Sequence, residues 1–394
     1  MKDEALVTPF CKLCKAETSV FHSPQNSMVG LEVSICGKCG FIQGNRSNLP
    51  LENTVGSSDE RDYLSCDADY APFRVGKRQM LGHQSKVLEW IREILRAEPR
   101  IYDGAAARGD FALFALDYFR PREIVLREFQ SEMLLNLEEL SLIHPTVRVV
   151  GASGPVQFEA ASFDFVYSTH SLEHFENPGS EMQNLAALVG ENGLLMVDVP
   201  DLESVNLDWL VEDYFYDQHL SYFCANSLER LAAQQGLVPV YLEREAGSLI
   251  MVFSKRANLR GVHSAFAPNA MLLAKTYSLN LESNRAAVGN RAIHVEEFLK
   301  KRRVDGPVVA VGCGRRFDAF IRYGLLPLNS FDYFVDNFLC LATPTIRGVE
   351  LFSIENLPIA SGVVPSFVTF STGSRTSVNA LLAQLFPSSE VLNA

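Results

Sequence analysis

The chain has 394 residues, of which 47% are hydrophobic and 21% charged, and its formal net charge at pH 7 is −12. This length predicts two or three domains, each with a core of its own. The composition is typical of a soluble globular protein, and the negative charge argues against non-specific nucleic-acid binding, which needs basic faces. The acidic start does not resemble a signal peptide and no apolar run is long enough to span a membrane, so we expect a cytoplasmic protein.

Two Cys-x-x-Cys pairs lie near the N-terminus, Cys11 with Cys14 and Cys36 with Cys39. Four thiolates in two such pairs can hold one tetrahedral zinc ion. Two disulfides or four buried thiols are the alternatives, and a cytoplasmic location disfavours disulfides. Because four protein ligands close the coordination shell, we predict a structural zinc that leaves no ligand role for His22.

The next segments carry weaker signals. Residues 45–58 are polar and contain Pro50 and Gly56, which predicts a linker. Residues 59–96 have apolar residues at helical spacing, which predicts a mostly helical segment. The apolar positions are Met80, Leu81, Val87, Leu88, Ile91, Ile94 and Leu95. An aromatic and polar stretch within this segment either folds over a substrate or packs in a core, and it contains Tyr63, Cys66 and Tyr70.

A strand, a turn of small residues, a helix and a second strand are predicted between Ile101 and Glu128. Small residues let the backbone approach a ligand, and Gly104 and Gly109 can adopt positive φ. The helix presents unpaired N–H groups to a ligand, and Glu128 can accept hydrogen bonds from both hydroxyls of a ribose. Because open α/β sheets bind ligands outside the carboxyl ends of their strands, we predict a cofactor cradle here. An ordinary βα turn is the alternative.

The spacing Asp103-x-Ala105-x-Ala107-x-Gly109, followed about twenty residues later by Glu128, resembles the first motif of class I S-adenosylmethionine methyltransferases. That motif usually reads Asp/Glu-x-Gly-x-Gly-x-Gly, so two of its glycines are alanines here. A dinucleotide fold is the other interpretation, but its Gly-x-Gly-x-x-Gly motif is absent. The resemblance implies cofactor contacts from Asp103, Gly104, Ala105, Gly109 and Glu128.

Alternating strands and helices continue after this turn and imply a mainly parallel sheet. Strands are predicted at 147–150, 163–167 and 193–200, with a helix over 181–189. The order FDFVYSTHSLEHFENP … ENGLLMVDVP resembles the fourth-strand and fifth-strand segments of class I methyltransferases. The resemblance implies their fold and adds Ser168 to the cofactor-binding residues.

A second landmark, Tyr214-Phe-Tyr-Asp-Gln-His-Leu-Ser-Tyr-Phe223, follows the last of these strands. A histidine is well suited to moving a proton near neutral pH, and nearby tyrosine hydroxyls can hydrogen-bond a carbonyl oxygen. The alternative is an aromatic helix packed on the core, with His219 as a core residue.

This stretch resembles the Tyr-x-Glu-His segment of sugar C-methyltransferases, which act on nucleotide-linked 4-keto-deoxysugars. That family also has a four-cysteine zinc domain in front and a small α/β domain behind, so the resemblance covers almost the whole chain. It implies catalytic roles for Tyr216 and His219 and, within Leu-Glu-His, for His174, with His170 as its nearest competitor. Gln218 stands where the family has glutamate, so a carboxylate that helps the histidine or holds the sugar is missing.

The last third of the chain predicts a mostly helical connector over 256–303 and then a second Rossmann-like unit. Its expected elements are a strand, turn and helix from 308, a strand at 331–336, and extended pieces at 348–358 and 366–370. Gly312-Cys-Gly314 and Asp336-Asn337 resemble features of the family's C-terminal domain, which packs against the first domain and walls the substrate cleft. A separate dinucleotide site is the alternative.

We therefore predict an α/β protein with a zinc domain (1–57), a class I methyltransferase domain (58–256) and a helical connector with a C-terminal Rossmann-like domain (257–394). The resemblance implies methylation of a nucleotide-linked ketosugar at carbon: His219 removes the proton beside the ketone, and Tyr216, His174 or a water stabilises the oxyanion. Methylation of oxygen, nitrogen or another carbon, and non-catalytic binding, are the alternatives. We expect a small-molecule substrate, no nucleic-acid or membrane partner, and a monomer or weak homo-oligomer.

Overall fold

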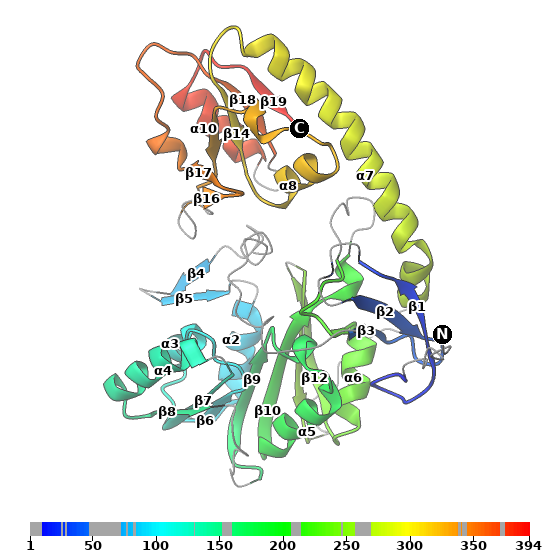
Figure 1. Ribbon diagram of the computed structural model, residues 1–394. Coiled ribbons are helices and arrows are strands. Elements are labelled where there is room, and N and C mark those ends of the chain that lie inside the picture. The colour runs from blue at the N-terminus through cyan, green and yellow to red at the C-terminus, as the bar shows by residue number, and fades with distance from the viewer. Residues whose placement is uncertain are drawn as a thin grey trace. The chain divides into compact units, whose positions relative to one another are not determined.

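The structure is a computed structural model of the chain (Figure 1). It describes residues 10–24, 27, 30–46, 72–75, 78–81, 84–129, 131–151, 160–205, 214–245, 247–256, 269–337, 340, 345–370 and 375–394. Two compact units are present, one within 1–56, 71–205 and 215–276, the other within 57–70, 206–214 and 277–394. The predicted boundaries at 57/58 and 256/257 border or lie within stretches outside the described residues, so they stay predictions.

The first unit is built on a seven-stranded sheet in the order β12-β13-β10-β9-β6-β7-β8. Only β13 runs antiparallel to its neighbours, which confirms the predicted, mainly parallel α/β fold. Strand order reverses between β6 and β9, and an open α/β sheet binds its ligand outside the carboxyl ends of the strands at this point. The strands are β6 (Arg100–Asp103), β7 (Glu123–Glu128), β8 (Val147–Gly151), β9 (Phe163–Thr169), β10 (Val189–Pro200), β12 (Val238–Glu245) and β13 (Ser248–Ser254).

Helices cover both faces of this sheet, so its central strands are buried on both sides. In β10, Leu194 and Met196 face one core, while Leu195 and Val197 face the other. The first core is shared with α2 (Ser85–Ile94), α3 (Asp110–Tyr118) and α4 (Ser131–Ile143), and the second with α5 (Pro178–Leu188) and α6 (Ala225–Ala233). This double burial explains the continuous apolar runs of β9 and β10 in the sequence.

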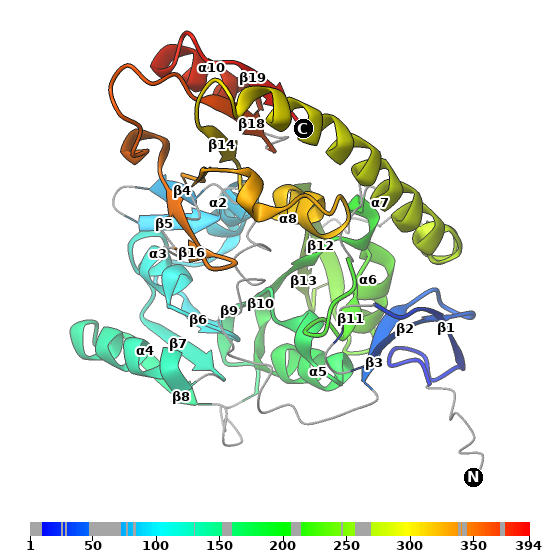
Figure 2. The same ribbon diagram turned by 45° about the horizontal axis from the view of Figure 1, so that its top comes forward.

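The cysteine-containing region is continuous with this unit. An antiparallel sheet in the order β1-β2-β3-β11 joins the N-terminal strands to a short strand from much later in the chain (Figure 2). Its strands are β1 (Thr18–His22), β2 (Leu31–Cys36), β3 (Ile42–Arg46) and β11 (Ser221–Tyr222). Cys11, Leu13, Cys36 and Phe41 also belong to the core beneath α5 and α6. The N-terminal region therefore helps to fix the chain just before β11.

Three sequence interpretations are corrected. Residues 72–81, expected to be mostly helical, form a hairpin of β4 (Pro72–Val75) and β5 (Arg78–Leu81). Within the described part of this segment, the predicted helix is restricted to α2. Pro72, at the start of β4, disfavours a helix there because proline is poorly tolerated inside one. Asn45 and Arg46, assigned to a linker, complete β3. The alternative of an aromatic helix at 214–223 is also wrong, because a turn leads there into β11.

Some expectations cannot be placed. The stretch with Tyr63, Cys66 and Tyr70, considered as a substrate cover, lies outside the described residues.

Among the helices of the described ranges, none combines the length and the apolar character that crossing a membrane requires.

The second unit contains a smaller sheet in the order β16-β17-β15-β14-β18-β19, parallel except for β16. It matches the predicted Rossmann-like unit. The turn after β14 is held by the acid at the end of β15, because Asp336 Oδ2 accepts a hydrogen bond from Cys313 N at 3.0 Å. Asn337 Oδ1 accepts one from Ile354 N at 2.8 Å. Asp336 and Asn337 thus hold the main chain at Cys313 and at Ile354 in place.

The elements of this unit are α7 (Asn269–Arg302), which begins in the preceding unit, β14 (Val308–Val311), α8 (Arg315–Arg322), β15 (Tyr333–Val335), β16 (Thr345–Ile346), β17 (Val349–Phe352), β18 (Ser366–Thr369), α10 (Arg375–Leu385) and β19 (Val391–Asn393).

The β3–β11 contact generates a prediction about Gly44. A Cβ at this position would lie 2.8 Å from Leu31 Cδ1 and 3.0 Å from the backbone oxygen of His219. Gly44→Val must therefore displace the backbone at His219, and we expect the melting temperature to fall by roughly 4 °C. Calorimetry would measure the melting temperature, and the NMR spectrum of the histidines would report the displacement at His219. Gly37→Ala is the control, because nothing lies within 4 Å of its Cβ; equal behaviour of the two variants would contradict the prediction.

Candidate active site

The turn after β6 has the geometry of a cofactor cradle. Gly104 N donates to Tyr167 O at 2.8 Å and Ala106 N to Arg127 O at 2.9 Å, so the turn is held to both neighbouring strands. Gly109 has φ +80° and is the N-cap residue of α3, as its role in the turn predicts. Gly104 does not use positive φ. It is needed for packing, because a Cβ there would lie 3.1 Å from Leu185 Cδ2.

The two acids of the motif lie at the ends of neighbouring strands. Ala107, with φ +46°, donates its N–H to Glu128 Oε2 at 2.6 Å, so an alanine adopts the left-handed conformation that glycine prefers. Asp103 Oδ1 accepts a hydrogen bond from Ala105 N at 3.2 Å. Burial raises the pKa of Asp103 to about 7, against that hydrogen bond and with help from the charge of Glu128.

These residues fit S-adenosylmethionine. Glu128 Oε1 also accepts a hydrogen bond from Phe129 N at 2.7 Å. A carboxylate has about four lone-pair sites, so Glu128 can accept ribose hydroxyls while it holds Ala107 and Phe129. Ala105 is half-buried and Ala107 is exposed, which leaves their side of the turn open to a ligand. Ser168 is buried at the switch point, with its Oγ 3.0 Å from Ser171 Oγ. Its hydroxyl therefore holds the chain that leaves β9.

A buried carboxylate with three histidines lies beyond the end of β9. Glu173, in the one-turn helix η3 (Leu172–His174), is 1% exposed. Its Oε1 lies 3.6 Å from His170 Nδ1, 3.9 Å from His174 Nε2 and 3.9 Å from His219 Nε2. Tyr216 completes the group, with its hydroxyl 2.7 Å from His219 Nε2. We call these five residues the Glu173 cluster.

The cluster contains all three residues that the sequence singled out as catalytic. His174 lies more than forty residues before Tyr216 and His219, and the fold brings the three side chains together. Glu173 was missed, although it stands between Leu172 and His174 in the quoted motif. An acid between a leucine and a histidine was the available signal, but only the approach of the later loop reveals its partners.

Main-chain hydrogen bonds hold the loop before β11 in place. Leu220 N donates to Glu173 O at 2.8 Å, and His174 Nδ1 lies 3.0 Å from Gln218 O. Because a carbonyl only accepts, Nδ1 of His174 carries the proton in this contact. On the other side, Lys12 Nζ donates to Leu220 O at 2.8 Å. The loop is thus fixed from both η3 and the N-terminal region.

The charges of the cluster are unequally divided. Burial lowers the pKa of His219 to about 3, although Glu173 acts to raise it, so its imidazole is neutral. Burial also acts to lower the pKa of His170, but Asp198 and Glu173 outweigh it and raise the value to about 9. Burial would raise the pKa of Glu173, yet the histidines lower it to about 2. The resting cluster is therefore a carboxylate paired with a protonated His170 beside a neutral His219.

Glu173, His174 and His219 could also be considered as metal ligands, because their donor atoms lie within 4.8 Å of one another. Donor–metal bonds of about 2.1 Å would place neighbouring donors roughly 3–3.5 Å apart, so the three would have to close in. His219 Nε2 would also have to leave Tyr216. The arrangement suits proton transfer better than metal binding.

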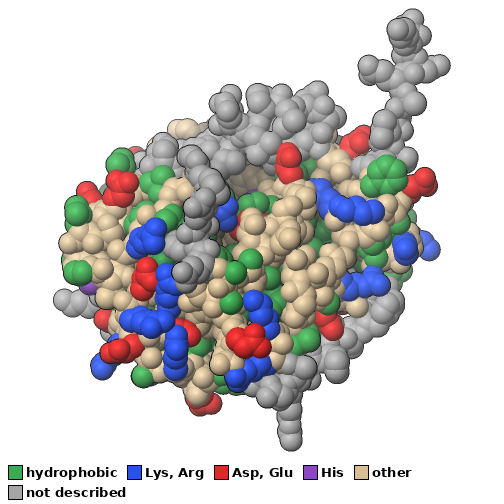
Figure 3. All heavy atoms as spheres, turned by 90° about the horizontal axis from the view of Figure 1, so that it is seen from below, with side chains coloured by type: hydrophobic (Ala, Val, Ile, Leu, Met, Phe, Trp, Pro, Cys, Tyr) green, Lys and Arg blue, Asp and Glu red, His purple; other side chains and the backbone are tan. Residues whose placement is uncertain are grey.

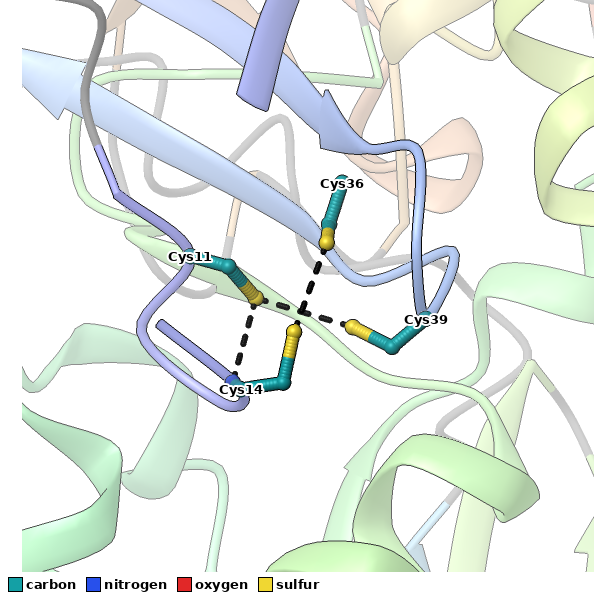
Figure 4. A group of neighbouring side chains, drawn as sticks. All are labelled: Cys11, Cys14, Cys36 and Cys39. Carbon is teal, nitrogen blue, oxygen red and sulfur yellow. Dashed lines mark hydrogen bonds between the residues drawn. The ribbon is translucent and has the colours of Figure 1, made fainter. Parts of the chain in front are cut away.

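The four N-terminal cysteines converge on one point (Figure 4). Cys11 Sγ lies 3.6 Å from Cys39 Sγ, and Cys14 Sγ lies 3.5 Å from Cys36 Sγ. A disulfide has a sulfur–sulfur distance of about 2.05 Å, whereas bonds of about 2.3 Å to one tetrahedral zinc place sulfurs roughly 3.8 Å apart. The sulfurs are therefore free thiols at the spacing that a zinc ion requires. The ring of His22 instead packs against Phe215, with centroids 6.0 Å apart.

A hollow of about 660 Å³ lies at the opposite, amino edge of the sheet and is lined by Arg100, Arg122, Glu123, Pro145, Thr146 and Arg148. It is far from the switch point in the topology, so it does not bear on the chemistry of the Glu173 cluster. On the face seen in Figure 3, Lys and Arg side chains alternate with Asp and Glu among the described residues.

Comparison with known proteins bears on the class of the enzyme. The sequence model of a family described as "Methyltransferase domain" matches residues 116–242. This match adds to the strand order and the cradle after β6. The protein is an S-adenosylmethionine-dependent methyltransferase. The matched residues run from α3 to β12 of this methyltransferase and include the Glu173 cluster. A search of curated protein sequences finds no match.

Solved structures similar to the methyltransferase share little sequence with it. The PH0226 protein of Pyrococcus horikoshii OT3 is 17% identical, with a TM-score of 0.40 over 50% of this chain and 99% of its own. An S-adenosylmethionine-dependent methyltransferase of Mesorhizobium loti is 11% identical, with a TM-score of 0.36 over 44% and 97%. One from Aquifex aeolicus is 12% identical, with a TM-score of 0.36 over 43% and 87%.

The pKa of His170 predicts how stability depends on pH. Because the folded value is raised from 6.5 to about 9, protonated His170 stabilises the fold fully below pH 6.5, and this contribution is lost as the pH rises through 9. Its size is roughly 3–4 kcal/mol, at 1.36 kcal/mol per pKa unit. Denaturant unfolding of wild type and His170→Gln at pH 6.5 and 9.5 should show their difference shrinking. A constant difference would refute the assignment of the proton to His170.

Proposed function

We propose that this methyltransferase methylates carbon beside the ketone of a nucleotide-linked ketosugar. The observation that carries the proposal is the pair of Tyr216 and His219 at the end of the sheet where the cofactor cradle lies, joined by a 2.7 Å contact. A buried, neutral imidazole is able to accept a proton, and a tyrosine is able to donate to an oxyanion. The resemblance of 214–223 to sugar C-methyltransferases supports the substrate class.

The cofactor would be held by the cradle. Glu128 would bind the ribose, the backbone of Gly104 and Ala105 would lie against the ligand, and Asp103, Gly109 and Ser168 would fix the turn and the strand end beside it. Bound S-adenosylmethionine supplies an electrophilic methyl group on sulfonium sulfur. The protein then contributes alignment of this methyl group with the acceptor carbon, which is the main requirement of such a transfer.

The chain's own residues would generate the carbon nucleophile. The C–H bond beside the ketone breaks, its proton passes to Nε2 of His219, and its electron pair forms the enolate. Tyr216, 37% exposed, can turn its hydroxyl from His219 to the enolate oxygen and so free Nε2. His174, 41% exposed at its side chain, is a second group beside this oxygen. Such preorganised donors contribute several kcal/mol, on the order of 3 for one oxyanion donor.

We also propose that Cys11, Cys14, Cys36 and Cys39 bind a structural zinc ion. All four sulfurs are within reach of one ion, and four protein ligands leave no position for a substrate. Reduced thiols that bind zinc are typical of a reducing compartment, which supports the cytoplasmic location. The zinc would act on catalysis only through the position of β3 and the loop before β11.

Calorimetric titration with S-adenosylmethionine and S-adenosylhomocysteine tests the cradle. We expect both to bind with micromolar affinity, because the open side of the turn and Glu128 are in place, and we expect Glu128→Ala to weaken both at least tenfold. Glu123→Ala, at the opposite end of β7, is the matched control. No binding of either compound would favour the non-catalytic alternative.

His219→Ala tests the proton transfer. With a dTDP-linked 4-keto-deoxysugar, we expect kcat to fall on the order of 10²–10⁴-fold, the usual contribution of a general base, while cofactor affinity stays unchanged. NMR of the product should place the new methyl group on carbon. His294→Ala, on an exposed part of α7, serves as the control. Full turnover by His219→Ala, or a methyl group on oxygen or nitrogen, would refute the mechanism.

Metal analysis tests the cysteine site. We expect one zinc per chain in the wild type and a loss of it in Cys36→Ser, with a lower melting temperature because Cys36 lies in the shared core. Cys340→Ser, in the second unit, should keep its zinc. A wild-type protein that is reduced, folded and free of zinc would contradict the proposal.

A further inference from the structure

The missing carboxylate at position 218 leaves a chemical problem in the proposed mechanism. When His219 takes the substrate proton, a cation forms in a buried place, where it is costly without an anion nearby. In the resembled family, a glutamate directly precedes the histidine. Here Gln218 has no charge, and its backbone oxygen is used by His174. The anion must therefore come from another element.

Glu173 has the position that this anion requires. Its Oε1 lies 3.9 Å from His219 Nε2, the atom that receives the proton. Its main chain is tied to the same loop, because Glu173 O accepts the Leu220 N–H at 2.8 Å. The side chain is 1% exposed, and neither carboxylate oxygen has a hydrogen-bond partner among the described residues. A carboxylate buried in this way can respond to a new charge on its neighbour.

The described groups that face Glu173 come from two segments. His170 and His174 flank it in the chain, and His219 and Tyr216 approach from the loop before β11. Asp198, at the end of β10, acts on His170 from the other side. His170 therefore lies near two acids, Asp198 and Glu173, whereas Glu173 is the acid nearest to His219. Protonation of His219 would place two cations beside one carboxylate, and this limits the lifetime of the imidazolium.

We propose that Glu173 is a positioning residue for His219, replacing from η3 the glutamate that is absent at position 218. It orients the imidazole and stabilises the imidazolium while the enolate carbon takes the methyl group. The C–CH₃ bond then forms as the sulfonium S–CH₃ bond breaks, and His219 afterwards releases its proton to solvent. This inference rests on the proposed base role of His219.

The test separates proton removal from methyl transfer. With S-adenosylhomocysteine in place of the methyl donor, exchange of the proton beside the ketone of a dTDP-linked 4-keto-deoxysugar with D₂O is followed by NMR. We expect Glu173→Gln to slow exchange about 100-fold with little change in KM, because the enolate step alone is affected. The double variant Glu173→Gln/Gln218→Glu should regain at least tenfold, since it restores a carboxylate beside His219.

Controls make each outcome decisive. Glu176→Gln, an exposed residue of the same segment, should exchange at the wild-type rate, and calorimetry with S-adenosylhomocysteine should show that Glu173→Gln still folds and binds. Wild-type exchange by Glu173→Gln, or no rescue by Gln218→Glu, would overturn the inference and leave the proposed function intact. Loss of exchange on EDTA treatment that Mn²⁺ restores would also overturn it, because Glu173 would then be a metal ligand. A wild type that neither exchanges nor methylates would remove the proposed function and the inference together.

Discussion

The backbone of one residue, Leu220, connects the parts of the first unit that matter for chemistry. Its N–H donates to the carbonyl of Glu173, and its own carbonyl accepts from Gly44 N and Lys12 Nζ. Buried main-chain groups must be paired, so the three contacts leave little freedom to the preceding histidine. The imidazole of His219 is thereby placed over a carboxylate from one segment, on a loop held by another.

Two kinds of acid lie at this edge of the sheet, and they differ in their hydrogen bonds. Asp103 and Glu128 end neighbouring strands and accept hydrogen bonds from main-chain N–H groups of the turn, so their oxygens have fixed partners. Glu173 is surrounded by imidazoles and has no such hydrogen bond among the described residues. Acids of the first kind suit binding, because hydrogen bonds fix their geometry. An acid of the second kind suits a reaction in which charge appears and disappears.

The sequence was most informative where structure depends on local spacing. The cysteine pairs and the turn after β6 were predicted because each is encoded within a few neighbouring residues. The parallel sheet was predicted because strands and helices alternate along the chain. Glu173 and the pairing of β3 with β11 were not, because both depend on segments that are distant in the chain. The hairpin at 72–81 was missed for a different reason: short apolar runs do not distinguish a strand from a helix.

The strand pairing of β3 with β11 has a consequence for how the molecule forms. Residues 42–43 pair with 221–222, so the N-terminal sheet cannot be completed until most of the first unit has been synthesised. Contacts of such long sequence separation close late and slowly. The N-terminal region is accordingly a poor candidate for exchange between proteins as an independent module. A chain that loses it would lack the strand that pairs with β11 and part of the core beneath α5 and α6.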